Sequence, residues 1–161
     1  MPKKIYVASP LGFSEVSRDF YYKKLIPEIE SCGFQVLDPW ELAPLEKVKK
    51  VSKMPFDKNK LDAWKILNME IGECNRQNID LSDGVFAVLD GVDVDSGTAS
   101  EIGYAYAKGK PILGYRGDFR LSADNIGGVV NIQVEYFIRK SGGTIITEFK
   151  NINKQLIHIL A

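Results

Sequence analysis

The sequence predicts an α/β fold in which a five-stranded parallel sheet lies between two layers of helices. Three observations predict it: short apolar runs alternate with longer segments of helical period, several of these segments end at a glycine, and no internal repeat or low-complexity tract interrupts the order. This pattern favours a flavodoxin-like (Rossmann-like) three-layer sandwich with strand order 2-1-3-4-5. Residues 1–161 are expected to form a single domain.

The strands and helices are expected in strict alternation. The apolar runs that predict strands are 4–8 (KIYVA), 34–38 (FQVLD), 84–90 (GVFAVLD), 111–115 (PILGY) and 143–148 (GTIITE). The helical segments are 14–31, 60–81, 98–108, 129–140 and the C-terminal NINKQLIHIL. The lysine-rich stretch 46–60 is expected to be a solvated surface loop or, alternatively, a lid over a pocket.

Composition excludes several classes of function. Acidic and basic residues number 21 each, so the chain has no excess of positive charge for a nucleic-acid polymer. Hydrophobic residues make up 45%, as in globular domains, and no apolar run is long enough to cross a membrane. The start MPKKIYVASP is not a signal peptide, which favours a cytoplasmic protein without a membrane partner.

Metal and redox chemistry have little support. Cys32 and Cys74 are far apart in sequence, and His158 lies in an apolar C-terminal stretch. None of the three has a partner at metal-ligand spacing. We expect all three to be packing residues and expect no metal site.

The predicted strand order places a ligand site at the carboxyl ends of strands 1 and 3, where the order reverses. The loops that leave these strands are SPLGF (9–13) and GVDVDSGTASE (91–101). Ser9 and Phe13 either shape a turn or contact a ligand, and the switch point favours contact. A P-loop and a G-x-G-x-x-G motif are both absent from the sequence, which leaves a phosphate cradle without support.

Glu101 has two interpretations. In the first, TASE is a capping box, in which Thr98 caps a helix and Glu101 reaches back to the backbone of the cap. In the second, Glu101 is catalytic, since it follows a strand end and Asp95 lies six residues upstream. The helix N-terminus would keep one carboxyl ionised as a nucleophile while another environment keeps a second carboxyl protonated as an acid. Two such carboxyls are typical of glycoside cleavage.

Four segments together resemble the nucleoside 2-deoxyribosyltransferase family. They are IYVASPLGFS, DLSDGVFAVLDG, DSGTASEIGYAYAKGKPIL and RGDFRLSADN followed by VNIQ, and they cover about residues 4 to 135 in the order of the family. The resemblance implies that Glu101 is the nucleophile, that Asp95 contacts the base and that Tyr6 hydrogen-bonds the nucleophile. Alternation along the strand leaves open that Tyr6 is ordinary core.

The resemblance also implies a set of substrate-binding residues. Asn131 matches an asparagine that a neighbouring subunit lends to the 5'-hydroxyl of the sugar, which implies a homo-oligomer, a dimer or hexamer, with shared sites. Asn75 stands where many members carry an aspartate; an amide cannot supply an acidic proton, which puts base preference and the leaving-group acid in doubt. Trp64 is interpreted as core rather than as a stacking platform. The substrate-binding set is Ser9, Phe13, Asn75, Gly97 and Asn131.

The implied reaction exchanges one base of a 2'-deoxyribonucleoside for another free base through a covalent glycosyl ester, with retention and without a cofactor. The substrates would be 2'-deoxyribonucleosides and free purine or pyrimidine bases. The nearest alternative is an N-glycosidase of 2'-deoxynucleoside 5'-monophosphates, although the strand-1 loop has few basic residues for a phosphate. A second alternative is a non-catalytic nucleotide-binding module in which Glu101 is only a helix cap.

Overall fold

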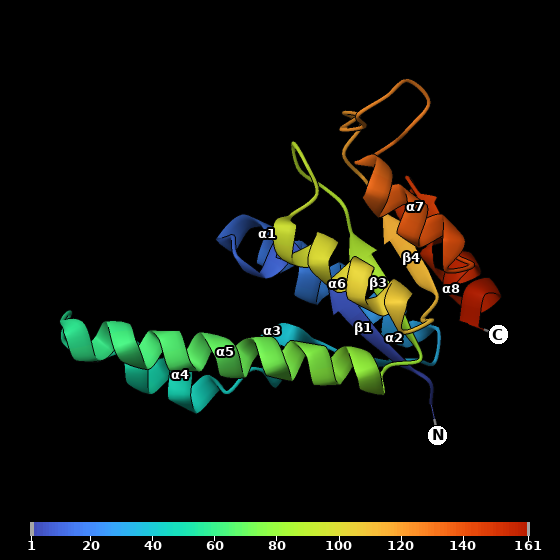
Figure 1. The fold of residues 1–161 in the computed structure, drawn as a ribbon. Coiled ribbons are helices and arrows are strands. Elements are labelled where there is room, and N and C mark those ends of the chain that lie inside the picture. Colours follow the sequence, from blue (N-terminus) through green and yellow to red (C-terminus); the bar gives the residue numbers. More distant parts are fainter. Residues whose placement is uncertain (1, 161) are drawn as a thin grey trace.

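The computed structural model describes residues 2–160 and contains the expected parallel sheet (Figure 1). The strand order is β2-β1-β3-β4-β5 with every neighbouring pair parallel, which confirms the predicted fold class. Strand β1 matches the run that predicted it, and the other four strands are shorter than theirs. Their bounds are β1 Lys4–Ala8, β2 Gln35–Leu37, β3 Gly84–Val88, β4 Ile112–Tyr115 and β5 Thr144–Ile146.

Strand β1 shows how the sheet divides the core into two layers. Ile5 and Val7 belong to the cluster on one face, and Tyr6 and Ala8 belong to the cluster on the other face. All four side chains are fully buried. Because successive side chains of a strand point to opposite faces, a central strand covered on both sides must be apolar throughout.

Helices cover both faces of the sheet. On the Tyr6 face lie α5 (Lys58–Leu81), α6 (Ser96–Ala107) and α7 (Ile132–Lys140). On the Ile5 face lie α1 (Glu15–Phe20), the π-helix η2 (Tyr21–Leu25), α2 (Ile26–Ser31) and α8 (Ile152–Leu160). Two short 3-10 helices follow strands β1 and β5: η1 (Pro10–Gly12) and η3 (Phe149–Asn151).

The helix expected over 14–31 is interrupted by the π-helix η2. The backbone N–H of Ile26 bonds to the carbonyl of Tyr21, five residues back. Pro27 follows and has no N–H with which to continue the regular pattern, so the wider turn accommodates the chain at this point. The fold is kept because Tyr21, Leu25 and Ile29 still face the sheet.

The prediction that 46–60 is a loop is wrong. The segment contains the helix α4 (Leu45–Ser52) and the start of α5, and a short helix α3 (Pro39–Leu42) precedes it. Leu45, Val48 and Val51 recur at helical spacing, and Val51 is buried. The lysines of α4 occupy its exposed side, so a charged surface concealed an amphipathic helix.

Other departures from the expected elements are smaller. Helix α7 begins at Ile132 rather than at 129, because Asn131 accepts hydrogen bonds from the backbone of Gln133 and Val134 as the N-cap. Cys32 and Cys74 are half-buried, but His158 is exposed on α8 and is not a packing residue. Among residues 2–160, no helix is long and apolar enough to cross a membrane.

Gly143 provides a test of the packing between β4 and the turn before β5. A Cβ atom on Gly143 would lie 1.7 Å from the carbonyl oxygen of Ile112, so we expect Gly143→Ala to lower the free energy of unfolding by roughly 1–3 kcal/mol or more. Gly72, inside α5, has nothing within 4 Å of such an atom. Gly72→Ala should therefore raise stability by roughly 0.5–1 kcal/mol. Urea unfolding measures both, and equal effects of the two changes would contradict the packing.

Candidate active site

A cavity of about 380 Å³ opens at the carboxyl ends of strands β1, β2 and β3. Its polar end is formed by six residues that come from the loops after β1 and β3, from the start of α6 and from α5. These are Ser9, Asn75, Asp95, Gly97, Thr98 and Glu101. Because parallel strands all end at the same edge of the sheet, residues far apart in sequence meet here, as the strand order predicted.

The rest of the cavity wall is apolar. Phe13 comes from the β1 loop, and the other residues come from the chain between β2 and β3. They are Pro39, Trp40, Ala43, Leu45, Val48, Trp64 and Ile71. The sequence analysis missed most of this wall because it considered only the loops after strands 1 and 3. The sequence DPW directly after the second strand was the available signal, since that strand ends at the same edge.

The carboxyl group of Glu101 is the most specifically held group in the cavity. The hydroxyl of Tyr6 donates a hydrogen bond of 2.6 Å to Glu101 Oε1, and the amide Nδ2 of Asn75 donates a longer one of 3.4 Å to the same oxygen. Among residues 2–160, no hydrogen bond ends on Oε2 of Glu101. The side chain is thus fixed through one oxygen, and the other is available for a ligand.

Burial raises the pKa of Glu101 to about 7, and the charge of Asp95 adds to this increase, while the Tyr6 hydrogen bond lowers the pKa. Burial therefore outweighs the ionising effect that we expected from the helix N-terminus. Glu101 is the sixth residue of α6, and the field of a helix terminus fades beyond its first turn. Burial likewise raises the pKa of Tyr6 far above its usual value, so Tyr6 is a hydrogen-bond donor here.

The capping-box interpretation of TASE is also wrong. The N-cap of α6 is Asp95, whose Oδ2 accepts from the backbone N–H of Thr98 at 3.0 Å and from its hydroxyl at 3.3 Å. Thr98 is thus inside the helix, and Glu101 bonds to Tyr6 instead of reaching back to a cap. The negative Asp95 suits this position because it faces the positive end of the helix dipole.

The remaining residues predicted near the switch point line the same cavity. Ser9 is buried, and its hydroxyl accepts from the backbone of Leu11, so it both shapes the turn and faces the cavity. Phe13 is exposed and packs edge-on against Trp40 at a ring distance of 4.6 Å. Trp64 lines the cavity, so its interpretation as a core residue is wrong.

Two polar atoms of the cavity wall have no hydrogen-bond partner among residues 2–160. They are Oδ1 of Asn75, an acceptor, and Nε1 of Trp40, a donor, and both are buried. Buried polar atoms without partners are rare in proteins because they lose the hydrogen bonds that water would provide. The free acceptor of Asn75 belongs to the side chain that contacts Glu101, whereas the indole of Trp40 packs against Gly12.

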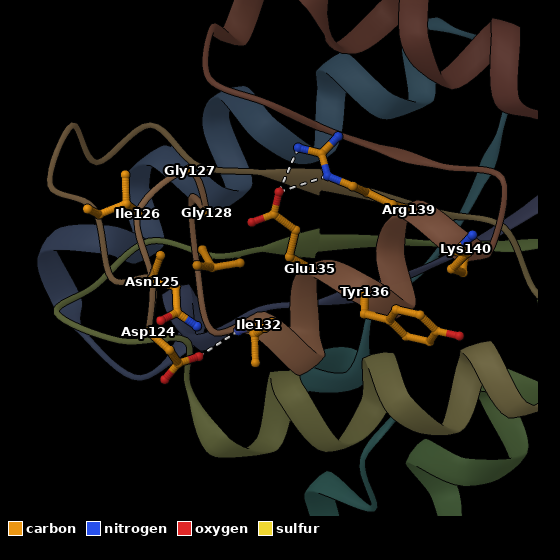
Figure 2. Close-up of a pocket in the computed structure, with 12 residues that line it drawn as sticks. Asp124, Asn125, Ile126, Gly127, Gly128, Ile132, Glu135, Tyr136, Arg139 and Lys140 are labelled. Atoms are coloured by element: carbon orange, nitrogen blue, oxygen red, sulfur yellow. Dashed lines mark hydrogen bonds and ion pairs between the residues drawn. The ribbon is translucent and has the colours of Figure 1, made fainter.

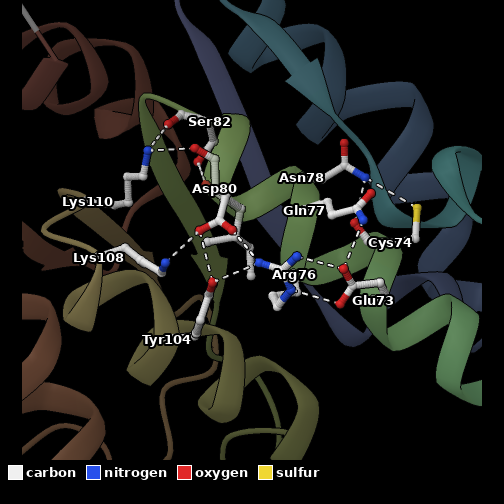
Figure 3. A network of polar contacts seen from close by, with 11 residues as sticks. Glu73, Cys74, Arg76, Gln77, Asn78, Asp80, Ser82, Tyr104, Lys108 and Lys110 are labelled. Atoms are coloured by element: carbon white, nitrogen blue, oxygen red, sulfur yellow. Dashed lines mark hydrogen bonds and ion pairs between the residues drawn. The ribbon is translucent and has the colours of Figure 1, made fainter.

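A polar network clamps the two helices that carry Asn75 and Glu101 (Figure 3). On α5, Arg76 pairs with Asp80 at 2.6 Å, and from α6 the hydroxyl of Tyr104 donates to Asp80 at 2.9 Å. Lys110 donates to the backbone carbonyls of Asp80 and Ser82 at the end of α5. Since Tyr104 lies one helical turn after Glu101, the network fixes the helix crossing next to the carboxyl.

Asn131 does not line the cavity that contains Glu101. It caps α7, and its Nδ2 donates to Asp124 at 3.1 Å. Beside it, a second cavity of about 340 Å³ lies between the loop 123–128 and α7, where Asp124 also accepts from the backbone of Ile132 and Glu135 pairs with Arg139 (Figure 2).

Across residues 2–160, no group of three or more His, Cys, Asp or Glu side chains is arranged to hold a metal ion. Of the same residues, those that line the Glu101 cavity include two carboxylates and no Lys or Arg. The charged groups of the cavity are therefore all acidic.

The family model for nucleoside 2-deoxyribosyltransferases matches residues 5–150. The chain belongs to this family. Its solved structural neighbours share the fold. One is a conserved protein of Enterococcus faecalis, with 24% identity and a TM-score of 0.73 over 98% of this chain and 99% of that chain. Another is a 2-deoxyribosyltransferase of Leishmania mexicana, with 22% identity and a TM-score of 0.65 over 99% of this chain and 97% of that chain. A CMP N-glycosidase of Clostridium botulinum is more distant, with 20% identity and a TM-score of 0.51 over 97% of this chain and 99% of that chain. The family match supports an enzyme of the nucleoside 2-deoxyribosyltransferase family, and the solved neighbours show its fold.

The raised pKa of Glu101 predicts how stability depends on pH. Because the folded state binds this proton more tightly than the unfolded state, the stability that it contributes is complete below about pH 4.5 and is lost as the pH rises through about 7. Glu101→Gln mimics the neutral acid. At pH 8 we expect this variant to be more stable than the unaltered protein by up to roughly 3 kcal/mol, and at pH 4 nearly equal to it.

Urea unfolding at the two pH values measures this difference. Glu30→Gln, at an exposed position of α2, is the matched control and should give no comparable gain at pH 8. A Glu101→Gln variant that is no more stable at pH 8 than at pH 4, relative to the unaltered protein, would contradict the buried environment of the carboxyl.

Proposed function

We propose that the protein transfers 2-deoxyribose between nucleobases by a retaining double displacement, with Glu101 as the nucleophile. The observation that carries this proposal is the single carboxyl held through Oε1 by Tyr6 and Asn75, with Oε2 left without a bond from residues 2–160, in a cavity of a member of this family. A buried carboxylate with a pKa near 7 is a stronger base, and hence a stronger nucleophile, than an exposed one.

The reaction proceeds in two displacements. Ionised Glu101 attacks the anomeric carbon through Oε2, the C–N bond to the base breaks, and its electron pair leaves with the base. The second base then attacks the ester from the face that the first base vacated, so the configuration is retained. The incoming base loses the proton that the departing base needs, which balances the exchange without a cofactor.

The proton that the departing base needs does not come from Asn75. The side chain facing Glu101 is an amide, which can hydrogen-bond a base but cannot protonate it as an acid. Its free Oδ1 accepts an N–H of the base, and Asp95 is the other polar group that we assign to base contact. Ser9, Phe13 and Gly97 complete the substrate-binding wall of the polar end.

The acidic lining favours nucleosides over nucleotides. A 5'-phosphate carries up to two negative charges and binds best to Arg, Lys or a helix N-terminus. The N-terminus of α6 is already capped by Asp95, and no Lys or Arg among residues 2–160 lines the cavity. The N-glycosidase of a 5'-monophosphate is therefore our second candidate, supported by the fold of the Clostridium botulinum enzyme.

The test is incubation with thymidine and adenine, followed by chromatography. We expect deoxyadenosine and thymine as products, and a loss of more than about 1,000-fold in Glu101→Gln with the fold unchanged. Inosine should react far more slowly than deoxyinosine, because a 2'-hydroxyl disfavours the oxocarbenium-like transition state.

Each alternative gives a different result in the same assay. Free deoxyribose as the only sugar product would indicate a hydrolase, and faster cleavage of deoxynucleoside monophosphates would indicate the second candidate. A non-catalytic binding module would give no exchange in either the unaltered protein or Glu101→Gln.

We also propose that the active form is a homo-oligomer, a dimer or hexamer, in which Asn131 reaches the cavity of a neighbour. Asn131 lies in a segment of the chain, the loop after β4 and the start of α7, that carries several exposed apolar side chains: Phe119, Leu121, Ile126 and Ile132. Exposed apolar side chains gathered in one region are typical of protein interfaces.

Sedimentation tests the oligomer. We expect Ile126→Asp to dissociate it and to lower exchange activity, since a buried carboxylate in the interface has no partner. Thr147→Asp adds the same charge at an exposed position after β5 and should change neither property. An unaltered protein that sediments as a fully active monomer would remove both the oligomer and the role of Asn131.

A further inference from the structure

The Glu101 cavity extends well beyond the residues that the proposed reaction uses. Its far part, here named the apolar lobe, is lined by Ala43, Leu45, Val48, Trp64 and Ile71. These side chains carry no charge, and the indole N–H of Trp64 is their only polar group. The lobe comes from α5, from α4, whose helical structure the sequence analysis missed, and from Ala43 just before α4.

The apolar lobe is continuous with the reactive end along one side of α5. Trp64, Ile71 and Asn75 are separated by seven and four residues, so they lie on the same face of the helix. At 1.5 Å per residue, this face runs roughly 16 Å from Asn75, which contacts Glu101, to Trp64. A ligand whose reacting carbon lies at Glu101 can therefore extend along α5 into the lobe.

Helix α4 closes the lobe from the other side. Val51 is buried, and Lys47 pairs with Glu70 of α5 at 2.6 Å, which holds α4 along the first half of α5 (Figure 1). Val48 lies one turn before Val51 and faces the cavity. The lobe thus has side chains of α4 on one side and of α5 on the other.

The geometry of a displacement determines which part of the substrate enters this lobe. The base departs on the side of the anomeric carbon opposite to the nucleophile, so it points away from Glu101. An unsubstituted amino group on that base would lose its hydrogen bonds with water against Leu45, Val48 and Ile71. An apolar substituent in the same place would instead gain by burial.

We propose that the apolar lobe is a subsite for an apolar substituent on the nucleobase. The preferred base is then one that carries an alkyl or arylmethyl group on its exocyclic amino nitrogen. The inference rests on the proposed function for the direction in which the base points, and it goes beyond that function by naming the class of base.

Base binding can be measured without turnover. The chain has two tryptophans, Trp40 and Trp64, and both line this cavity. Quenching of tryptophan fluorescence by a free base therefore reports occupancy in the absence of any sugar donor. The matched probes are adenine and 6-benzylaminopurine, which differ only in the apolar substituent.

We expect 6-benzylaminopurine to bind at least about 10-fold more tightly than adenine, since each buried methylene is worth several-fold in affinity. Val48→Asp places a charge in the lobe and should reduce this preference to less than about twofold. Ser52→Asp adds the same charge to the exposed end of α4, outside the lobe, and should preserve the preference. Circular dichroism checks that both variants fold.

Equal or weaker binding of 6-benzylaminopurine would overturn the proposal, and so would a preference that Val48→Asp leaves intact. Competition between the two bases in exchange with thymidine separates this outcome from failure of the proposed function. Tighter binding of 6-benzylaminopurine by fluorescence, without base exchange from thymidine, would support the subsite and reject the transferase. Exchange that uses both bases equally would preserve the transferase and reject the subsite.

Discussion

The hydrogen bond from Tyr6 to Glu101 is the contact on which the arrangement of the cavity depends. Tyr6 is fully buried in the central strand β1, where backbone pairing with β2 and β3 fixes its position. Its hydroxyl therefore sets the location of Glu101 Oε1 relative to the sheet. Helix α6 has to approach with Glu101 facing Tyr6, and α5 has to cross α6 so that Asn75 reaches the same oxygen.

This arrangement sets two electrostatic effects against each other. Burial and the charge of Asp95 make ionised Glu101 costly, whereas the Tyr6 hydrogen bond favours the ionised form, and burial is the larger effect. The network around Asp80 holds α5 and α6 together beside this carboxyl. A carboxylate with a raised pKa is a stronger base, and this carboxylate is the nucleophile of our proposed mechanism.

The sequence predicted the sheet, its order and the meeting of Ser9, Asp95 and Glu101, because strand ends in a parallel sheet converge by geometry alone. Local patterns were less reliable. The motif S/T-x-x-E fits residues 98–101, yet Asp95 caps α6. Asp95 offers the backbone of Thr98 a carboxylate acceptor, and Glu101 is already bonded to Tyr6. Tyr6 could be interpreted from the sequence either as a core residue or as a partner of Glu101. It is both, because its ring is buried in the core while its hydroxyl donates to Glu101.

The chain between β2 and β3 explains why the rest of the cavity was hard to predict. A crossover between parallel strands needs about a dozen residues, and this one is far longer, with α5 alone spanning 24 residues. The sheet accounts for Ile79 near the end of α5, which packs in the core, but not for Trp64 near its start. That first half and α4 are held mainly by each other, so their sequence is constrained by the cavity that they enclose. The reactive end is fixed by the strand ends, and the apolar lobe can therefore change its shape, and with it the choice of base, without moving Glu101.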